Sequence, residues 1–515
     1  MIFDRENVAL LLPRMAPPLA ARLAARAGLD HSALTDPTVP FDVAHYSAEA
    51  KRRFVGAQAA LFHYWMIGEG RGIAPHPDFD PQSYCRFNPD VTYQGYKPYA
   101  HYLNFGRHEG RRIQREPMDE QLACPDFNAL LQQPVPAGTP LVNVVIPVHG
   151  NRKLSLRTIA SVLASRPKTP YELVVIDDDS PDPVLKAELA QLAAKGFLKL
   201  LTNDRNRGFV ASANRGLEVG ADRDVVLLNS DTYVHDDWLD RLLSGLHSRK
   251  TIATASPISN TATILSYPIF LQDNDWPTPS DSAMVDDICR LLAKAPVEIP
   301  TALGFCMAID RICLKQIGYF DEGNFGRGYG EENDFSMRAA RAGWCHVAVP
   351  NVFVWHRGGG SFGDERDIRI QAALKKLEEL HPGYGSAVHE FIARDPLREL
   401  RRALDIARLR LEAKPKVMQL HQPVRDDSKV VPLVLRADVP PFVGAYRVTA
   451  HAQAPLPNLP RICGRSTIHE LAQLMQELDV AEARIRAGDR LRFRAAVVLE
   501  LAAKRAGVRL SHMHY

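Results

Sequence analysis

Short apolar runs that end in polar residues recur through the middle of the chain. Each run is about as long as a strand that is buried on both faces of a sheet. The runs are residues 142–148, 172–176, 198–201 and 225–228. Segments with helical periodicity separate them, at residues 156–164, 184–195 and 209–219. Strands that alternate with helices at this spacing predict an α/β fold with a mostly parallel, doubly wound sheet.

The pattern continues in the second half of this region. Residues 302–309 and 347–354 predict two further strands. Between them, a loop rich in glycine delivers Glu331 and Glu332 to the first turn of a helix that runs to residue 342. The last strand is followed by Trp355 and His356 and then by the glycine-rich residues 358–363.

The rest of the chain divides around this α/β region. The motif Phe-Asp, Tyr and His-Tyr at residues 41–64 recurs 38 residues later at residues 79–102, which predicts a helical repeat module. Its aromatic and histidine side chains are interpreted as packing positions, although a metal or sugar site is the alternative. The predicted domains are a helical module at 1–120 with repeats 41–78 and 79–116, a linker at 121–140, an α/β domain at 141–385, a connecting helix at 386–415 and a partial Rossmann-like domain at 416–515.

Composition excludes several classes of function. The net charge is +3 and 24% of residues are charged, so the surface gives no support to a nucleic-acid role. The seven cysteines contain no Cys-x-x-Cys pair, which disfavours a disulfide framework or a structural zinc site. No apolar run approaches the roughly 18 residues that span a bilayer, so a cytoplasmic location is predicted. Two helices, at 9–28 and 397–411, could instead lie on a membrane surface, but packing within the protein is favoured for both.

The polar residues at the strand ends carry the candidate chemistry. Asp177 and Asp231 each follow a predicted buried strand, and open α/β sheets bind ligands at that edge. A carboxylate there can hold Mg²⁺ or Mn²⁺ against the phosphates of a nucleotide. A solvated turn is the alternative for these two acids. For the acids at the start of the later helix, Glu331, Glu332 and Asp334, the alternative is ordinary helix capping.

Six motifs in this order resemble those of an inverting family 2 glycosyltransferase with the GT-A fold. They are residues 145–148 (Val-Ile-Pro-Val), 175–180 (Val-Ile-Asp-Asp-Asp-Ser), 206–209 (Asn-Arg-Gly-Phe) with Asn214, 229–231 (Asn-Ser-Asp), 330–334 (Gly-Glu-Glu-Asn-Asp) with Arg338, and 355–356 (Trp-His). The resemblance covers about residues 141–385.

The resemblance implies a role for each matching residue. Glu332 would be the catalytic base, Asp231 and His356 would hold Mn²⁺ or Mg²⁺, and Asp177 would contact the nucleotide base. The implied donor-binding residues are Pro147, Asp177, Asp178, Arg207, Gly208, Asn214, Asn229, Ser230 and Asp231. The implied acceptor-side residues are Glu331, Asp334 and Arg338. Asn229 departs from the family pattern because it replaces the first acid of Asp-x-Asp, and glutamate replaces the more usual aspartate as base.

The C-terminal residues resemble the opening part of a GT-B glycosyltransferase domain, with strands at 416–420, 431–435 and 508–512 and helices at 468–478 and 492–506. No activity is assigned to this part.

The predicted function is transfer of a sugar from a UDP-, dTDP- or GDP-sugar to a glycan or lipid-linked glycan, in the synthesis of a bacterial surface polysaccharide. Peripheral contact with the inner membrane and with other polysaccharide-assembly proteins is left open. A scaffold that binds sugar nucleotides or glycans without turnover is the alternative. A nucleotidyltransferase is a weaker third choice, because no glycine-rich loop with a basic residue follows the first strand.

Overall fold

The computed structural model describes most of the chain from residue 41 onward. The described residues are 41–54, 56–68, 73–81, 84, 98–103, 124–133, 135, 138–220, 222–271, 273–274, 276–326, 328–358, 366–420, 430–437, 445–450, 456–463, 467–486 and 494–513. The helix predicted at 9–28, part of the linker and most of the glycine-rich stretch 358–363 lie outside them.

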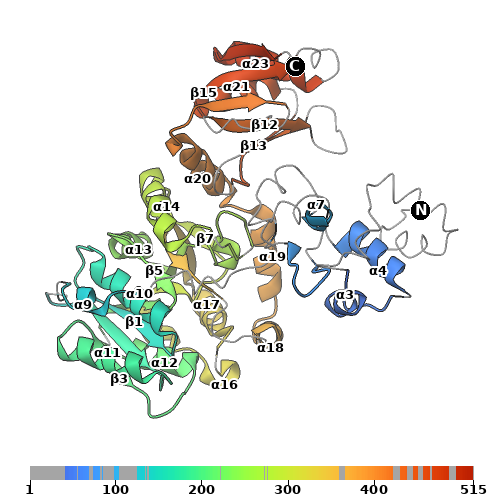
Figure 1. The fold of residues 1–515 in the computed structure, drawn as a ribbon. Helices are drawn as coiled ribbons and strands as arrows, with labels where there is room; N and C mark the ends of the chain where they lie inside the picture. The colour runs from blue at the N-terminus through green and yellow to red at the C-terminus, as the bar shows by residue number, and fades with distance from the viewer. Residues whose placement is uncertain are drawn as a thin grey trace.

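A group of short helices lies at the N-terminal end of the described chain (Figure 1). Buried aromatic side chains form the core between them. The helices are α3 (Val43–Glu49), α4 (Ala57–His63), the π-helix η3 (Tyr64–Gly68) and α7 (Pro98–His101). The repeated residues form the same hydrogen bond twice: Tyr46 with His63 at 2.7 Å, and Tyr84 with His101 at 2.9 Å. All four side chains are buried, so their contacts agree with the packing interpretation.

An eight-stranded mixed sheet forms the centre of the α/β region, in the order β3-β2-β1-β4-β8-β6-β9-β7. The pairs β1–β2, β2–β3, β1–β4 and β6–β9 are parallel, whereas β8 and β7 run antiparallel to their neighbours. The strands are β1 (Val142–Val148), β2 (Tyr171–Asp177), β3 (Lys199–Thr202), β4 (Asp224–Leu228), β6 (Ile252–Ile258), β7 (Val297–Ile299), β8 (Cys306–Ile309) and β9 (Cys345–Phe353).

Helices cover both faces of this sheet, because its strands are apolar on both sides. One face and its core include α10 (Arg152–Ala164), α11 (Pro183–Ala194), α13 (Trp238–Leu246) and α14 (Pro279–Leu292). The other face is covered by α12 (Phe209–Leu217), α15 (Arg311–Ile317) and α17 (Glu331–Arg341). The doubly wound α/β prediction is therefore confirmed. The single strand predicted at 302–309 is shorter than expected, since only its second half forms β8.

Three helices follow the sheet: α18 (Arg366–Leu380), α19 (Tyr384–Arg394) and α20 (Arg398–Leu411). The last of these packs against two cores. Its residues Leu400 and Leu404 belong to the core beneath the central sheet, and Ile406 and Leu409 belong to a second core. The basic helix predicted at 397–411 is thus packed within the protein.

The second core lies under a six-stranded sheet of order β14-β13-β12-β11-β15-β16. Strands β12, β11, β15 and β16 are parallel, and β13 and β14 are antiparallel additions. The elements are β11 (Lys416–Gln419), β12 (Val431–Ala437), β13 (Ala445–Ala450), β14 (Arg461–Cys463), α21 (Thr467–Glu477), β15 (Val480–Arg486), α23 (Arg494–Ala506) and β16 (Arg509–Met513). Each strand and helix predicted for this part has a counterpart.

Candidate active site

The carboxyl ends of β2, β1 and β4 lie side by side, because β1 pairs in parallel with both neighbours. Asp177 ends β2 opposite Val148, the last residue of β1. Its side chain is 2% exposed, and one carboxylate oxygen accepts a hydrogen bond from the Ser180 amide at 2.9 Å. The sheet therefore presents Asp177 at the edge where ligands of such folds bind.

Asp178 organises the loop that follows β3. Its carboxylate accepts hydrogen bonds from the Asn203 side chain at 2.7 Å and from the backbone amides of Arg207 and Gly208, both at 2.8 Å. These bonds occupy groups that were predicted to bind the donor. The geometry favours a loop-holding role for Asp178, and its direct contact with a donor stays a prediction, as does that of Pro147, which is buried within β1.

His149 lies at the same edge and was not assigned a role from the sequence. Its exposed ring donates from Nδ1 to the carbonyl of Asp178 at 2.9 Å, and Nε2 accepts from the side chain of Asn206 at 2.9 Å. The sequence signal that could have identified His149 is its position directly after the first predicted strand. His149 therefore joins the loops after β2 and β3 to the site.

The side chain of Asn214 is hydrogen-bonded to other parts of the protein. Its side chain is buried, donates to the carbonyl of Phe320 and the carboxylate of Glu322, and accepts from the Phe320 amide. These bonds join α12 to the segment before α16 (Glu322–Phe325). The geometry favours this bracing, and donor binding by Asn214 stays a prediction.

Asp231 and His356 are brought together by two very short strands. In the pairing of β5 (Thr232–Tyr233) with β10 (Trp355–His356), His356 lies opposite Thr232, the neighbour of Asp231. The His356 Nε2 and Asp231 Oδ1 atoms are 3.3 Å apart. The Nδ1 atom of His356 donates to the Thr261 carbonyl at 2.8 Å. This bond fixes the ring so that Nε2 faces the carboxylate.

The two charges stabilise each other in a buried place. Burial favours the neutral form of Asp231, but attraction to His356 and hydrogen bonds from His356 and the Gly358 amide outweigh it and lower the pKa of Asp231. Burial likewise disfavours the imidazolium of His356, but the charge of Asp231 outweighs it and raises the pKa of His356. In the absence of another cation, the two residues therefore form an ion pair.

Asn229 supplies a further oxygen beside this pair. Its Oδ1 atom is buried and has no hydrogen-bond partner in the part of the chain that the structure describes. Asn229 and the half-buried Ser230 directly precede Asp231. An amide oxygen, a carboxylate and a correctly oriented imidazole nitrogen suit Mn²⁺ or Mg²⁺, with imidazole favouring Mn²⁺. The residues present therefore fit a divalent cation, even though Asn229 replaces an acid.

Glu331 and Glu332 form the first turn of α17, after Gly330 with a φ of 93°. Burial raises the pKa of Glu332, although hydrogen bonds from the backbone amides of this turn oppose the rise. Burial and the charge of Glu332 raise the pKa of Glu331 well above its usual range. One carboxylate oxygen of each residue is buried and has no hydrogen-bond partner among the described residues. Each of these adjacent acids thus has one carboxylate oxygen free to bind a ligand. Because the two are buried side by side, the state in which both are ionised is disfavoured.

Gly304 lies next to Glu332, and the following residue, Phe305, contacts His356. A Cβ atom at Gly304 would lie 3.5 Å from Glu332 Cδ, so the glycine leaves the space that Glu332 occupies. The neighbouring ring of Phe305 stacks on His356. The structure therefore places Glu332 and His356 next to two adjacent residues, Gly304 and Phe305.

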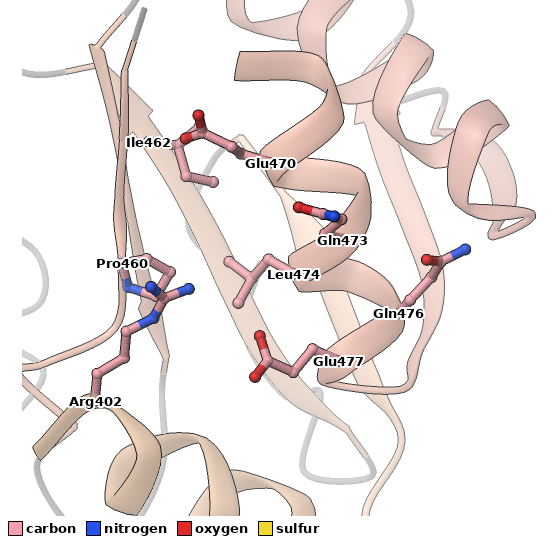
Figure 2. Close-up of a pocket in the computed structure, with 8 residues that line it drawn as sticks. All are labelled: Arg402, Pro460, Ile462, Glu470, Gln473, Leu474, Gln476 and Glu477. Carbon is pink, nitrogen blue, oxygen red and sulfur yellow. The ribbon is translucent and has the colours of Figure 1, made fainter. Parts of the chain in front are cut away.

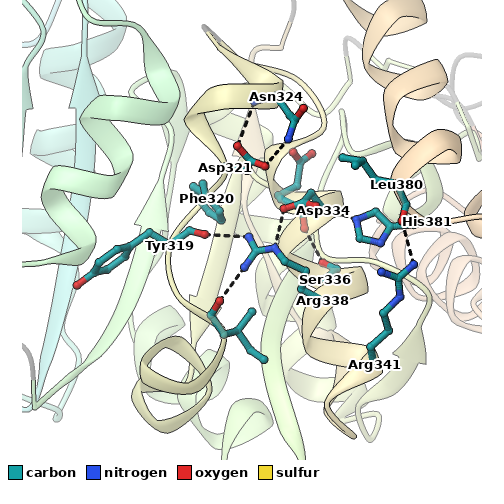
Figure 3. A network of polar contacts seen from close by, with 12 residues as sticks. Tyr319, Phe320, Asp321, Asn324, Asp334, Ser336, Arg338, Arg341, Leu380 and His381 are labelled. Carbon is teal, nitrogen blue, oxygen red and sulfur yellow. Dashed lines mark hydrogen bonds and ion pairs between the residues drawn. The ribbon is translucent and has the colours of Figure 1, made fainter.

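Asp334 and Arg338 belong to a buried network that Figure 3 shows. Asp334 Oδ1 is 2.7 Å from Nε2 of His381, and both side chains are 3–4% exposed. Its other oxygen accepts from Arg338 at 2.8 Å, and Arg338 also donates to the carbonyls of Ile317 and Tyr319. These bonds brace the start of α17. The geometry favours bracing for both residues, and their contact with an acceptor stays a prediction.

Two other features lie away from these residues. Asp224, His247 and Asp310 offer ligand atoms within 4.8 Å of one another, but Asp224 begins β4, at the opposite end of the strand from Asp231. A cavity of about 480 Å³ lies between α20 and α21 (Figure 2). It is lined by Arg402, Pro460, Ile462, Glu470, Gln473, Leu474, Gln476 and Glu477, none of which was predicted as a site residue.

Asp224 and Asp310 already have structural partners. Asp224 accepts from the Arg311 amide at 2.8 Å and from His247 at 2.7 Å, while Asp310 caps α15 through the Cys313 amide. The hydrogen bond to Asp224 raises the pKa of His247, which favours an ion pair there. This cluster is interpreted as an ion pair beside a helix cap.

Residues 143–310 match the family model described as Glycosyl transferase family 2, and this part of the chain is a domain of that family. Among similar proteins, the Probable N-acetylgalactosaminyltransferase 7 of Caenorhabditis elegans is 26% identical over 243 residues, which are 43% of this chain and 39% of that protein. The Putative polypeptide N-acetylgalactosaminyltransferase 13 of Drosophila melanogaster is 32% identical over 168 residues, 30% of this chain and 29% of that protein. The chain thus spans less than half the length of these relatives.

A solved structure of GalNAc-T7 with UDP, GalNAc and Mn²⁺ superposes with a TM-score of 0.36 at 22% identity, over 51% of this chain and 53% of that chain. Within the part of the chain that the structure describes, no helix combines the length and the apolar character needed to cross a membrane.

Proposed function

We propose that this chain is an inverting glycosyltransferase that moves a sugar from a nucleotide-sugar donor to a hydroxyl group of an acceptor. One observation carries the proposal: Glu332 lies next to Gly304, and His356, paired with Asp231, stacks on the following residue, Phe305. One oxygen of Glu332 is buried and has no hydrogen-bond partner among the described residues. A diphosphate leaving group needs positive charge on one side, and the acceptor hydroxyl needs a base on the other. The family 2 domain at 143–310 supports the same assignment.

Three residues would hold the divalent cation: Asp231, His356 and Asn229, with Mn²⁺ or Mg²⁺ as the expected ion. When bound there, the cation neutralises negative charge that develops on the departing diphosphate. His356 can contribute a neutral Nε2 because its Nδ1 proton is held by the Thr261 carbonyl. Asp177 and the loops around His149 and Asn206 would contact the nucleoside at the strand ends.

Glu332 would act as the base. As the acceptor oxygen bonds to the anomeric carbon, the bond from that carbon to the diphosphate oxygen breaks, and the acceptor proton passes to Glu332. Burial brings the pKa of Glu332 closer to the working pH, which suits a general base. Glu331 would be protonated beside it, because two charged carboxylates in this place repel each other.

The proposal extends to the identities of the donor and the acceptor. The sequence alone allowed UDP-, dTDP- or GDP-sugars and a glycan or lipid-linked glycan acceptor. The names of the relatives add N-acetylgalactosamine as a candidate donor sugar and a polypeptide as a candidate acceptor. The comparisons give no support to bacterial surface polysaccharide synthesis, so UDP-N-acetylgalactosamine with a serine- or threonine-containing peptide is the first pair to test. A cytoplasmic location, contact with a membrane and association with assembly proteins stay predictions.

The direct test is release of a nucleoside diphosphate by the purified chain with Mn²⁺, a panel of UDP-, GDP- and dTDP-sugars, and peptide and glycan acceptors. Turnover above the rate of donor hydrolysis in the absence of acceptor is expected with at least one pair. Donor binding without turnover on any acceptor would favour the alternative, a binding scaffold. Absence of both binding and turnover across the panel would contradict the proposal.

A further inference from the structure

The loop formed by residues 259–271 and 273–274, here called the asparagine loop, contacts the backbone of His356. Asn260 Oδ1 accepts a hydrogen bond from the His356 amide at 2.9 Å, and Asn260 Nδ2 donates to the His356 carbonyl at 2.8 Å. One side chain thus satisfies both backbone polar groups of a single residue. Asn260 is 1% exposed, so water is not available to replace these bonds.

The next residue, Thr261, binds the ring of His356. The carbonyl of Thr261 accepts from Nδ1 of His356 at 2.8 Å. The backbone and the ring of His356 are therefore fixed from the same two residues of the loop. Since both backbone groups and one ring nitrogen are occupied, the remaining nitrogen can face only one direction, and it faces Asp231 at 3.3 Å.

The loop is itself held in one conformation. Asn274 donates from its backbone amide and its side chain to the carbonyl of Asn260, both at 3.0 Å, and Asn260 donates back to the carbonyl of Asn274 at 2.9 Å. Thr263 has a φ of 45°, which is rare for a β-branched residue. Such a backbone persists only where the surroundings over-determine it, and it clusters at functional sites.

The loop is also tied to α20. Tyr267 donates to the Asp405 carboxylate at 2.8 Å, and the Tyr267 amide donates to the carbonyl of Ser259 at 2.9 Å. The other Asp405 oxygen accepts from the Asn458 amide at 2.7 Å, on the C-terminal sheet side of the junction. A continuous set of hydrogen bonds therefore runs from the C-terminal sheet to His356.

We propose that Asn260 is a positioning residue for the cation-binding site: it sets the place and orientation of His356 and so contributes to metal affinity without touching the metal. The proposal rests on the proposed function, in which His356 and Asp231 hold a divalent cation. Groups that orient a metal ligand from behind commonly contribute 10- to 100-fold to metal affinity.

The test measures Mn²⁺ binding to the full chain in the presence of UDP, by loss of the free Mn²⁺ signal in electron paramagnetic resonance. We expect Asn260→Ala to weaken Mn²⁺ binding by about 10- to 100-fold. Asn260→Asp should have a smaller effect, because aspartate still accepts from the His356 amide but cannot donate to its carbonyl. The melting temperature is recorded for each variant, so that a loss of folding is recognised.

Asn143→Ala is the matched control. Asn143 is also fully buried, donates to the Val219 carbonyl at 2.6 Å and accepts from Arg223, but it lies at the start of β1, away from the strand ends. It should lower the melting temperature and leave Mn²⁺ affinity unchanged.

The outcomes separate the two claims. If the parent binds Mn²⁺ and Asp231→Asn weakens binding while both Asn260 variants match the parent, the positioning role is overturned and the proposed function stands. If Asn143→Ala weakens Mn²⁺ binding as much as Asn260→Ala, the effect is one of general stability and the positioning role is likewise overturned. If the parent itself binds no Mn²⁺ with UDP, both claims fall.

Discussion

The rings of Phe305 and His356 are stacked, with centroids 4.9 Å apart and planes tilted by 17°. The carbonyl of Phe305 also accepts from the amide of Asn229 at 2.8 Å. Phe305 precedes the antiparallel strand β8, which lies beside β4. Phe305 therefore contacts both Asn229, two residues before Asp231, and the histidine that faces Asp231, so a change on either side of this ring is expected to affect the other.

Asp231→Asn should weaken Mn²⁺ binding in the presence of UDP and reduce turnover. The substitution removes the only carboxylate of the Asn-Ser-Asp motif while keeping its shape. Part of the turnover should return at high Mn²⁺ concentration, because the loss is in ligand affinity. A metal titration of the reaction rate checks this. Unchanged Mn²⁺ dependence would place the metal elsewhere, and Asp224→Asn at the opposite end of β4 is the matched control.

Glu332→Gln should lower kcat by about 10²- to 10⁴-fold while donor affinity stays near the parent value, because only proton transfer is lost. Glu331→Gln is the control on the neighbouring acid and should retain most turnover. Kinetics of both variants with one donor and acceptor pair would decide between them. Loss of turnover in Glu331→Gln, with Glu332→Gln active, would assign the base to Glu331.

The rate should depend on pH through the same carboxylate. A base must be deprotonated to act, so kcat/KM should rise with pH through the pKa of Glu332. Burial raises this pKa, so the rise should be centred above the usual range of a glutamate. Glu331 is proposed to be protonated beside Glu332, so Glu331→Gln removes no charge and should leave the rise close to its position in the parent. A pH profile of kcat/KM for parent and variant checks the direction, and a shift toward higher pH would contradict it.

The sequence predicted the half of the site that depends on strand ends. Apolar runs located β1, β2 and β4, and parallel strands necessarily bring Asp177 and Asp231 to one edge. The antiparallel placement of β8 has no local signal, because strand order is a tertiary property. His356 reaches Asp231 through two strands of two residues each, which are too short for periodicity to reveal.

The acceptor-side residues were harder to predict, because the sequence gives the type of each residue but not the groups to which its side chain is hydrogen-bonded. Asp334 and Arg338 match the motif, yet their polar atoms contact His381 and backbone carbonyls. The partner His381 lies 47 positions away. Asn260 was missed for the same reason, since nothing near it in sequence indicates a bond to residue 356.

His346 should make the protein sensitive to acid. Burial lowers the pKa of His346 to about 4, and the ring bonds to the hydroxyl of Thr254 at 2.7 Å and to the carbonyl of Ser336 in α17 at 2.9 Å. The unfolded chain takes up this proton near pH 6.5, so stability should fall between about pH 6.5 and pH 4. His346→Gln should flatten this part of the curve of unfolding free energy against pH, measured by urea unfolding. An unchanged slope would contradict the assignment.

Asp334→Ala should destabilise the fold by about 3–5 kcal/mol, since it leaves the buried His381 without its carboxylate and removes one partner of the half-buried Arg338. Glu390→Ala is the control, because the Glu390–Arg394 pair is exposed and should change stability by less than about 0.5 kcal/mol. Urea unfolding of both variants measures the difference. Equal stability of the two variants would show that the network does not brace α17.

Helix α20 contributes apolar residues to both sheets, and Arg408 lies 3.5 Å from the centre of the Trp276 ring at their junction. A fragment that stops before this helix would expose apolar side chains of the first core. A fragment that begins after it would lack the side chains that α20 contributes to the second core. The smallest autonomous folding unit that contains the family 2 domain therefore reaches beyond the residues of the candidate active site. Heating should melt the two sheets as one cooperative unit.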